Sequence, residues 1–176
     1  MAMATIPLIP NDGVLLINDG AGSPLSYAIV YEDGDFTLGG LKKSQKEVQE
    51  FLDRGRFYSV RETNDVSIDW SFSCHAIAML GDGVTASPTD VFLKLGVWSA
   101  ATNLLPAAAG GGASGVWCVK MTFTGERTDY GATADTTAVL KYCHAESLDF
   151  GEGIPGKWSL KGKLYCHSTD YLTLTG

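Results

Sequence analysis

Histidine and basic charge are both scarce in this chain. Its 176 residues include 3 histidines and 13 lysines and arginines, against 20 aspartates and glutamates, which gives a formal net charge of -7. A duplex-binding groove needs clustered cations to neutralise phosphate. The charge balance therefore argues against a nucleic-acid-binding protein.

The sequence has no Cys-x-x-Cys pair, and each histidine directly follows a cysteine, as Cys74-His75, Cys143-His144 and Cys166-His167. Neighbouring residues on a strand point to opposite faces, so neither a zinc site nor a Cys-His nucleophile is favoured. The fourth cysteine, Cys118, stands apart from any histidine. We predict reduced cysteines that act as small core residues, with no metal and no cofactor.

Long apolar runs are also missing, because no stretch of eighteen apolar residues occurs and the start MAMATIPLIPNDG lacks a basic, apolar leader pattern. We therefore expect a soluble chain without an export signal and without a membrane partner. Residues 106–115, PAAAGGGASG, lack the Gly-Lys-Ser/Thr ending of a phosphate-binding loop and are predicted to form a flexible connection. No Ser-His-Asp arrangement is evident, so the chain is not expected to be an enzyme.

What the chain does contain favours a single β-rich domain over residues 1–176, with 45% hydrophobic residues and 21 glycines. The clearest strand lies at 66–74, where apolar residues alternate with Ser67, Asp69, Ser71 and Ser73. Further strands are expected at 14–17, 25–31, 117–124, 138–149 and 157–166. They predict a mainly β fold, either a β-sandwich or a partly open barrel.

One helix is predicted after the turn at 81–83. Ser87 is a good N-cap, Pro88 suits the first helical position, and Val91, Phe92 and Leu95 form an apolar stripe before Gly96. The helix is expected to run for roughly ten residues and to flank the sheet.

Residues 41–62 carry six basic and four acidic residues, so this segment is net +2 on a body of net -9. A basic arm on an acidic body would steer one copy toward another, although a solvated surface loop is the alternative. Its local structure is open. Ser44 to Glu47 match a capping box, and Leu41, Val48 and Leu52 have helical spacing.

The order of several motifs resembles the tail tube proteins, or major tail proteins, of long-tailed bacteriophages. An acidic turn at 31–36 is followed by Leu52-Asp53-Arg54-Gly55 and then by the Trp-Ser-Phe-Ser strand. The opening segment 11–20 and the closing strand after Gly151-Glu152-Gly153 are similar to the same family. The likeness is one of pattern and extends over most of the chain.

This resemblance implies a long hairpin arm at about 36–62, and six copies that close into a ring. Stacked rings would form the conduit for DNA ejection in the virion tail, after assembly in the host cytoplasm. The implied partners are further copies of this chain and the tape measure, tail terminator and distal tail proteins, while DNA passes without specific binding.

The resemblance also implies roles for two sets of residues. Contacts between rings would involve Lys42, Lys43, Lys46, Arg54 and Arg56. A hydrophilic, acidic lumen would be lined by Ser67, Asp69, Ser71, Ser73 and Glu146. Both termini, 1–10 and 170–176, would become ordered only on assembly.

Two other functions fit the sequence. The ring protein of bacterial type VI secretion shares the tube architecture, and secretion with effector cargo would distinguish it. A monomeric β-sandwich that binds carbohydrate could use Trp98, Trp117 or Trp158 as a stacking platform, and sugar-dependent fluorescence of a monomer would favour it.

Overall fold

Ten strands and one short α-helix make up the computed structural model, which describes residues 13–30, 34–40, 46–53, 56–75, 87–126, 134–151, 156–166 and 168–176. The strands are β1 (Gly13–Asn18), β2 (Ser26–Val30), β3 (Gly34–Leu38), β4 (Lys46–Asp53), β5 (Arg56–Asp65), β6 (Ile68–His75), β7 (Val119–Gly125), β8 (Thr136–Gly151), β9 (Lys157–Leu164) and β10 (Leu172–Thr175). The helical segments are α1 (Pro88–Leu93) and the 3-10 turns η2 (Gly96–Ala100) and η3 (Ala107–Ala109). The predicted mainly β class is confirmed.

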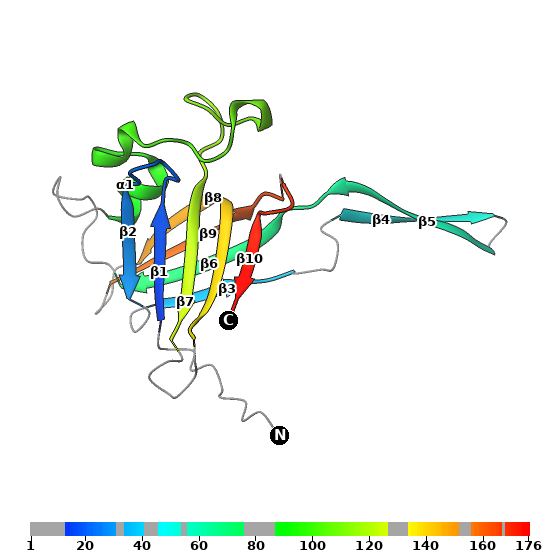
Figure 1. Ribbon diagram of the computed structural model, residues 1–176, viewed down its shortest axis with the longest axis horizontal. Helices are drawn as coiled ribbons and strands as arrows, with labels where there is room; N and C mark the ends of the chain where they lie inside the picture. Colours follow the sequence, from blue (N-terminus) through cyan, green and yellow to red (C-terminus); the bar gives the residue numbers. More distant parts are fainter. Residues whose placement is uncertain are drawn as a thin grey trace, which may run out of the picture.

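Eight strands form one antiparallel sheet in the order β2-β1-β7-β8-β9-β6-β3, with β10 also paired to β8. The long strand β8 pairs with β7 and β10 through its first half and with β9 through its second half. Its register shifts between Ala145 and Ser147, at the point where it passes from one group of strands to the other. The sheet therefore curves into two facing layers and stays open, as a partly open sandwich (Figure 1).

Alternation along the strands builds the core between these layers. On β9, Trp158, Leu160 and Leu164 are buried, while Lys157 and Lys161 are exposed. On β6 the inward residues are Ile68, Trp70, Phe72 and Cys74, as the sequence predicted. Phe36 of β3 stacks on Phe123 of β7 at 6.0 Å between ring centroids, which joins the two layers.

The helix α1 begins as predicted and ends early. The side-chain oxygen of Ser87 accepts a hydrogen bond from the Asp90 amide, and the Asp90 carboxylate accepts one from the Ser87 amide. The helix stops at Leu93 because Lys94 adopts the left-handed conformation, with φ of 57°. Leu95 therefore leaves the apolar stripe and is 41% exposed, and Trp98 of η2 is the next buried residue.

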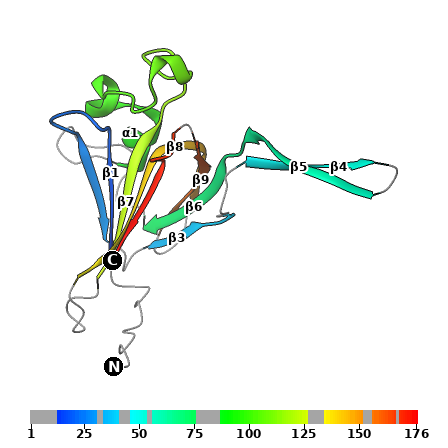
Figure 2. The same cartoon turned by 45° about the vertical axis from the view of Figure 1, so that its right-hand side comes forward.

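The arm is a β-hairpin, and the alternative helix over 41–53 is wrong wherever the structure describes it, because β4 pairs with β5 from Lys46 to Asp65. Its predicted start at Phe36 is also wrong, since Phe36 to Leu38 pair with β6 in the main sheet. Among the described elements, β4 and β5 make substantial contact only with each other. Both views show the hairpin directed away from the two layers (Figures 1 and 2).

Two segments that were expected to be loose are structured. Within 106–115, the amide of Val116 donates to the Gly110 carbonyl at 2.9 Å, and Asn103 Nδ2 donates to the Val116 carbonyl at 2.6 Å. At the C-terminal end, Leu172 to Thr175 pair with β8, so this segment does not wait for assembly to form a strand. The N-terminal segment 1–10 lies outside the described residues.

Candidate self-assembly interface

One face of the β4–β5 hairpin carries exposed aliphatic side chains. Residues opposite one another in an antiparallel pair share a face, and the register pairs Val48 with Glu62 and Glu50 with Val60. Leu52 lies on this face as well, because it is two residues from Glu50. Val48, Leu52 and Val60 are 60%, 61% and 46% exposed. We call Val48, Glu50, Leu52, Val60 and Glu62 the aliphatic face of the hairpin.

Side chains on the opposite face of the hairpin make contacts with one another and with the hairpin backbone. The Arg61 guanidinium lies over the Phe51 ring at 5.4 Å from its centroid. Thr63 Oγ1 donates to the Glu47 carbonyl at 3.3 Å, and Asn64 Nδ2 donates to the Glu47 carboxylate at 3.4 Å. Phe51 is 38% exposed on this side, so the aliphatic face, where Val48, Leu52 and Val60 are 46–61% exposed, is the less covered of the two.

A two-stranded ribbon without a second layer is marginally stable in water, because each strand has no apolar surface to pack against. The hairpin has this geometry and also leaves large aliphatic side chains in solvent. Exposed apolar residues that gather on one face indicate an interaction surface. The hairpin therefore has the properties of an element that is completed by a partner.

Of the five cations predicted to contact the next ring, Lys46 lies on β4 and is exposed, and Arg56 begins β5. Lys42, Lys43 and Arg54 lie outside the described residues. From Lys46 to Asp65 the sequence has four basic and five acidic residues, so the hairpin itself is net -1. The positive excess of 41–62 comes from the two lysines that precede the hairpin.

The polar residues of β6 lie together on the outside of the second layer, opposite the buried Trp70 and Phe72. Asp69 is exposed, and the serines of the predicted set, Ser67, Ser71 and Ser73, are half-buried. This face is not acidic overall, because β9 adds lysines beside them: Lys163 pairs in register with Asp69, and Lys161 with Ser71. Glu146 of β8 lies 3.9 Å from Lys163 and completes a mixed-charge surface.

The first layer presents a different outer face, which sequence reasoning missed. Registered partners across β2, β1, β7, β8 and β10 form two rows that contain no charged residue. We call this set the threonine face: Val14, Thr124, Thr137 and Thr175 in one row, and Ala28, Leu16, Thr122, Val139 and Thr173 in the other. Thr-x-Thr spacings on β7 and β10 were the available signal, but only strand order shows that they align.

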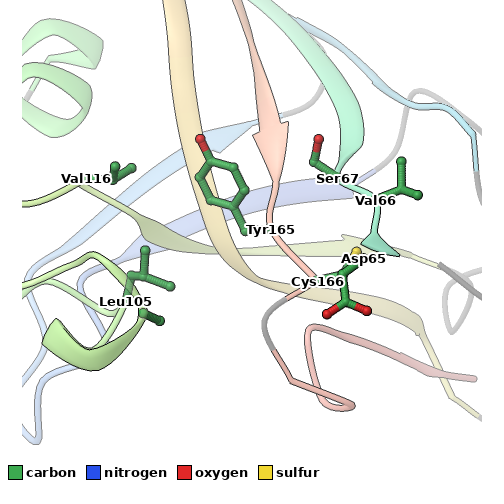
Figure 3. Close-up of a pocket in the computed structure, with 8 residues that line it drawn as sticks. Asp65, Val66, Ser67, Leu105, Val116, Tyr165 and Cys166 are labelled. Atoms are coloured by element: carbon green, nitrogen blue, oxygen red, sulfur yellow. The ribbon is translucent and has the colours of Figure 1, made fainter. Parts of the chain in front are cut away.

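A cavity of about 390 Å³ lies where the hairpin joins the body (Figure 3). It is lined by Asp65, Val66 and Ser67 from the β5–β6 junction, by Leu105, Ala109 and Val116 around the η3 segment, and by Tyr165 and Cys166 after β9. Burial is the main cause that raises the pKa of Cys166 to about 11, and the charge of Asp65 is the second cause. The thiol stays protonated at neutral pH, so the cavity offers no activated nucleophile.

The other cysteines and the tryptophans have structural surroundings. Cys74, Cys118 and Cys143 are buried, and none of the four cysteines, which all lie within the described residues, forms a disulfide. Trp98 and Trp158 are 1% and 4% exposed, so they cannot serve as a carbohydrate-stacking platform. Trp117 is half-buried, with its Nε1 donating to the Val91 carbonyl at 2.9 Å and Lys94 over its ring.

Within the described part of the chain, no three His, Cys, Asp or Glu side chains are grouped to hold a metal ion. None of the helices described there is long and apolar enough to cross a membrane. Comparison of the chain with protein-family models, with curated proteins and with solved structures found no match. The functional argument therefore depends on the surfaces described above.

Proposed function

We propose that this chain is the structural subunit of a phage tail tube, in which copies close into hexameric rings and the rings stack into the conduit for DNA ejection. The observation that carries the proposal is the β4–β5 hairpin. It projects from the body and exposes Val48, Leu52 and Val60 on a ribbon that has no supporting layer. In a ring, such an element would hold a neighbouring copy.

The open sheet supports the same proposal. β2 and β3 end the strand order, so among the described strands each has a neighbour on one side only. Unpaired edges attract strands from other chains, and a closed ring of copies can use them. Closure through β2 and β3 would convert two edges of each copy into contacts between copies, while β10, which pairs only with β8 among the described strands, is a third edge.

The outer face of β6 and β9 is the proposed lumen wall. Ser67, Asp69, Ser71, Ser73 and Glu146 would face the channel together with Lys161 and Lys163. A wall with charges of both signs is hydrophilic, and Asp69 and Glu146 lie beside Lys163, so passing DNA would meet no continuous cationic site. The chain as a whole is acidic, which also disfavours adhesion.

The proposal is tested by negative-stain electron microscopy of the purified protein over a concentration series. Stacked rings with a central hole are expected, and Leu52→Asp with Val60→Asp should abolish stacking because two carboxylates replace apolar contacts. Leu93→Asp is the matched control, since Leu93 is 54% exposed and lies on α1, away from the hairpin. Uniformly small particles at high concentration would contradict the proposal and favour a monomeric binding module.

The lumen assignment has its own test. Asp69→Lys would place a cation beside Lys163 and Lys161 and create a positive patch on the proposed channel wall. We expect tubes of normal appearance but slowed DNA ejection from virions that carry the variant. Normal ejection would show that this face does not line the channel.

A further inference from the structure

The threonine face is an exposed, uncharged sheet surface that needs an explanation. Val14 is 41% exposed, and Ala28, Thr173 and Thr175 are also exposed. The other five members of the face are half-buried: Leu16, Thr122, Thr124, Thr137 and Val139. Thr137 and Thr175 contact each other through their hydroxyl oxygens across β8 and β10. With strands about 4.8 Å apart and outward residues about 6.8 Å apart along each strand, the two rows cover about 300 Å². An area of about 300 Å² is at the lower end for the largest apolar patch of a typical monomer, and such patches are often functional.

The hairpin has a surface that matches this face in chemistry. Its aliphatic face presents Val48, Leu52 and Val60, which need an apolar partner. Of the two outer sheet faces, that of β6 and β9 carries Asp69, Lys161 and Lys163, so it would force charges against aliphatic side chains. The threonine face offers methyl groups and no charge in its two rows.

The charges around the two surfaces are also complementary. Glu50 lies between Val48 and Leu52 and opposite Val60, and Glu62 lies opposite Val48, so two carboxylates stand within the aliphatic face. On the sheet, Lys120 of β7 and Lys141 of β8 follow directly after the two uncharged rows, on the same side of the sheet. Lys141 is ion-paired with Asp170 of its own chain, so Lys120 is the cation that a hairpin carboxylate would meet. Contact of a hairpin carboxylate with Lys120 would fix the register of the apolar contact and exclude other orientations.

We propose that the aliphatic face of one copy's hairpin packs on the threonine face of another copy. The inference rests on the proposed function and names the surface that receives the hairpin. The contact is between copies because both views show the hairpin directed away from its own body. It is small compared with the roughly 1,200–2,000 Å² of a stable two-protein interface, so single contacts are weak and repetition around a ring supplies the strength.

The proposal is tested by cross-linking between copies of the full chain. All proteins carry Cys166→Ser, because Cys166 is the half-buried native thiol and the other three are buried. A Val60→Cys protein is mixed with a Thr122→Cys protein of different mass and treated with a short bismaleimide, whose reach tolerates small differences in register. The control mixture pairs Val60→Cys with Ser73→Cys, which lies half-buried on the charged outer face.

We expect the mixed-mass dimer to form at least several-fold more with Thr122→Cys than with Ser73→Cys, in samples that show tubes by electron microscopy. Equal or stronger cross-linking to Ser73→Cys, or none to either in samples with tubes, would overturn this inference and leave the proposed function standing. Particles that stay monomeric at every concentration would overturn both. Thermal unfolding of each variant checks that it is folded before mixing.

Discussion

The body and the hairpin use the same strand alternation in opposite ways. In the body, the inward residues of β6 and β9 are almost fully buried, as Trp70 at 2% and Leu160 at 0% exposure show. In the hairpin, Leu52 and Val48 remain about three-fifths exposed at 61% and 60%. The difference is the second layer, which the body has and the hairpin lacks. Alternation of apolar and polar residues thus indicates which face of a strand packs against another layer. It does not show whether that layer belongs to the same chain or to another copy.

The largest expected effect separates these two regions by stability. Trp70→Ala should lower the free energy of unfolding by about 3–5 kcal/mol, because it removes a buried ring and leaves a cavity. Leu52→Ala should change this free energy by less than about 0.5 kcal/mol in dilute monomer, because the exposed Leu52 side chain makes few packing contacts. Urea denaturation followed by tryptophan fluorescence measures both.

The comparison fails if Leu52→Ala destabilises the dilute monomer by more than about 1 kcal/mol, because the hairpin would then be packed within its own chain. Leu160→Ala is a useful control for the body, as it lies in the same core and preserves all four tryptophans. Its loss of unfolding free energy should lie in the same range as that of Trp70→Ala.

A second prediction concerns how closely the body is packed. Gly162 of β9 lies against the bend of β8, and an added Cβ would be 2.0 Å from the His144 carbonyl oxygen and 2.5 Å from Trp70 Cζ2. Gly162→Ala should therefore cost about 2–3 kcal/mol through overpacking. Gly22→Ala has no atom within 4 Å of its added Cβ and should cost far less. Equal costs in urea denaturation would contradict this packing argument.

Much of the body could be predicted because local chemistry determined it. The phase of β6 followed from strict alternation, and the start of α1 followed from Ser87 and Pro88. The end of α1 could not be predicted, because it depends on the left-handed conformation of Lys94. A glycine at this position would have indicated a left-handed conformation, but the residue there is a lysine.

The surfaces were harder to predict, since they depend on which strands become neighbours. Lys161 and Lys163 alternate with Leu160 and Leu164 in the sequence, but only the pairing of β9 with β6 puts them beside Asp69. The threonine face likewise needs the order β1-β7-β8 and the addition of β10. The choice between hairpin and helix at 46–53 rested on the long-range pairing with β5, which helical spacing does not reveal.

The third prediction is a loss of stability at high pH that belongs to the body. Burial raises the pKa of Cys118 from 9.0 to about 12. Burial is the main cause that raises the pKa of Tyr27 from 10.0 to about 12, and the charge of Cys74 is the second cause. The unfolded chain therefore releases these protons first, so stability is full below about pH 9 and falls as pH rises toward 12.

Urea denaturation at pH 8 and pH 10.5 should show a loss of about 1 kcal/mol or more from Cys118. Cys118→Ala should reduce this difference between the two pH values, whatever its own stability at pH 8. Leu52→Ala should leave the difference unchanged, because the hairpin contributes none of these buried groups. An unaltered pH difference in Cys118→Ala would show that the buried thiol is not its source.

The smallest expected effect lies within the hairpin. Arg61→Ala removes the guanidinium over the Phe51 ring, an exposed contact that stabilises the ribbon by about 0.5 kcal/mol. Hydrogen exchange of the β4 and β5 amides should become about twofold faster, while amides of β6 and β9 keep their rates. Arg61→Lys keeps a cation over the ring and should restore part of the protection. If the body amides also exchange faster in Arg61→Ala, the hairpin and the body unfold together, and the exposed ribbon is not an independent element that waits for a second copy.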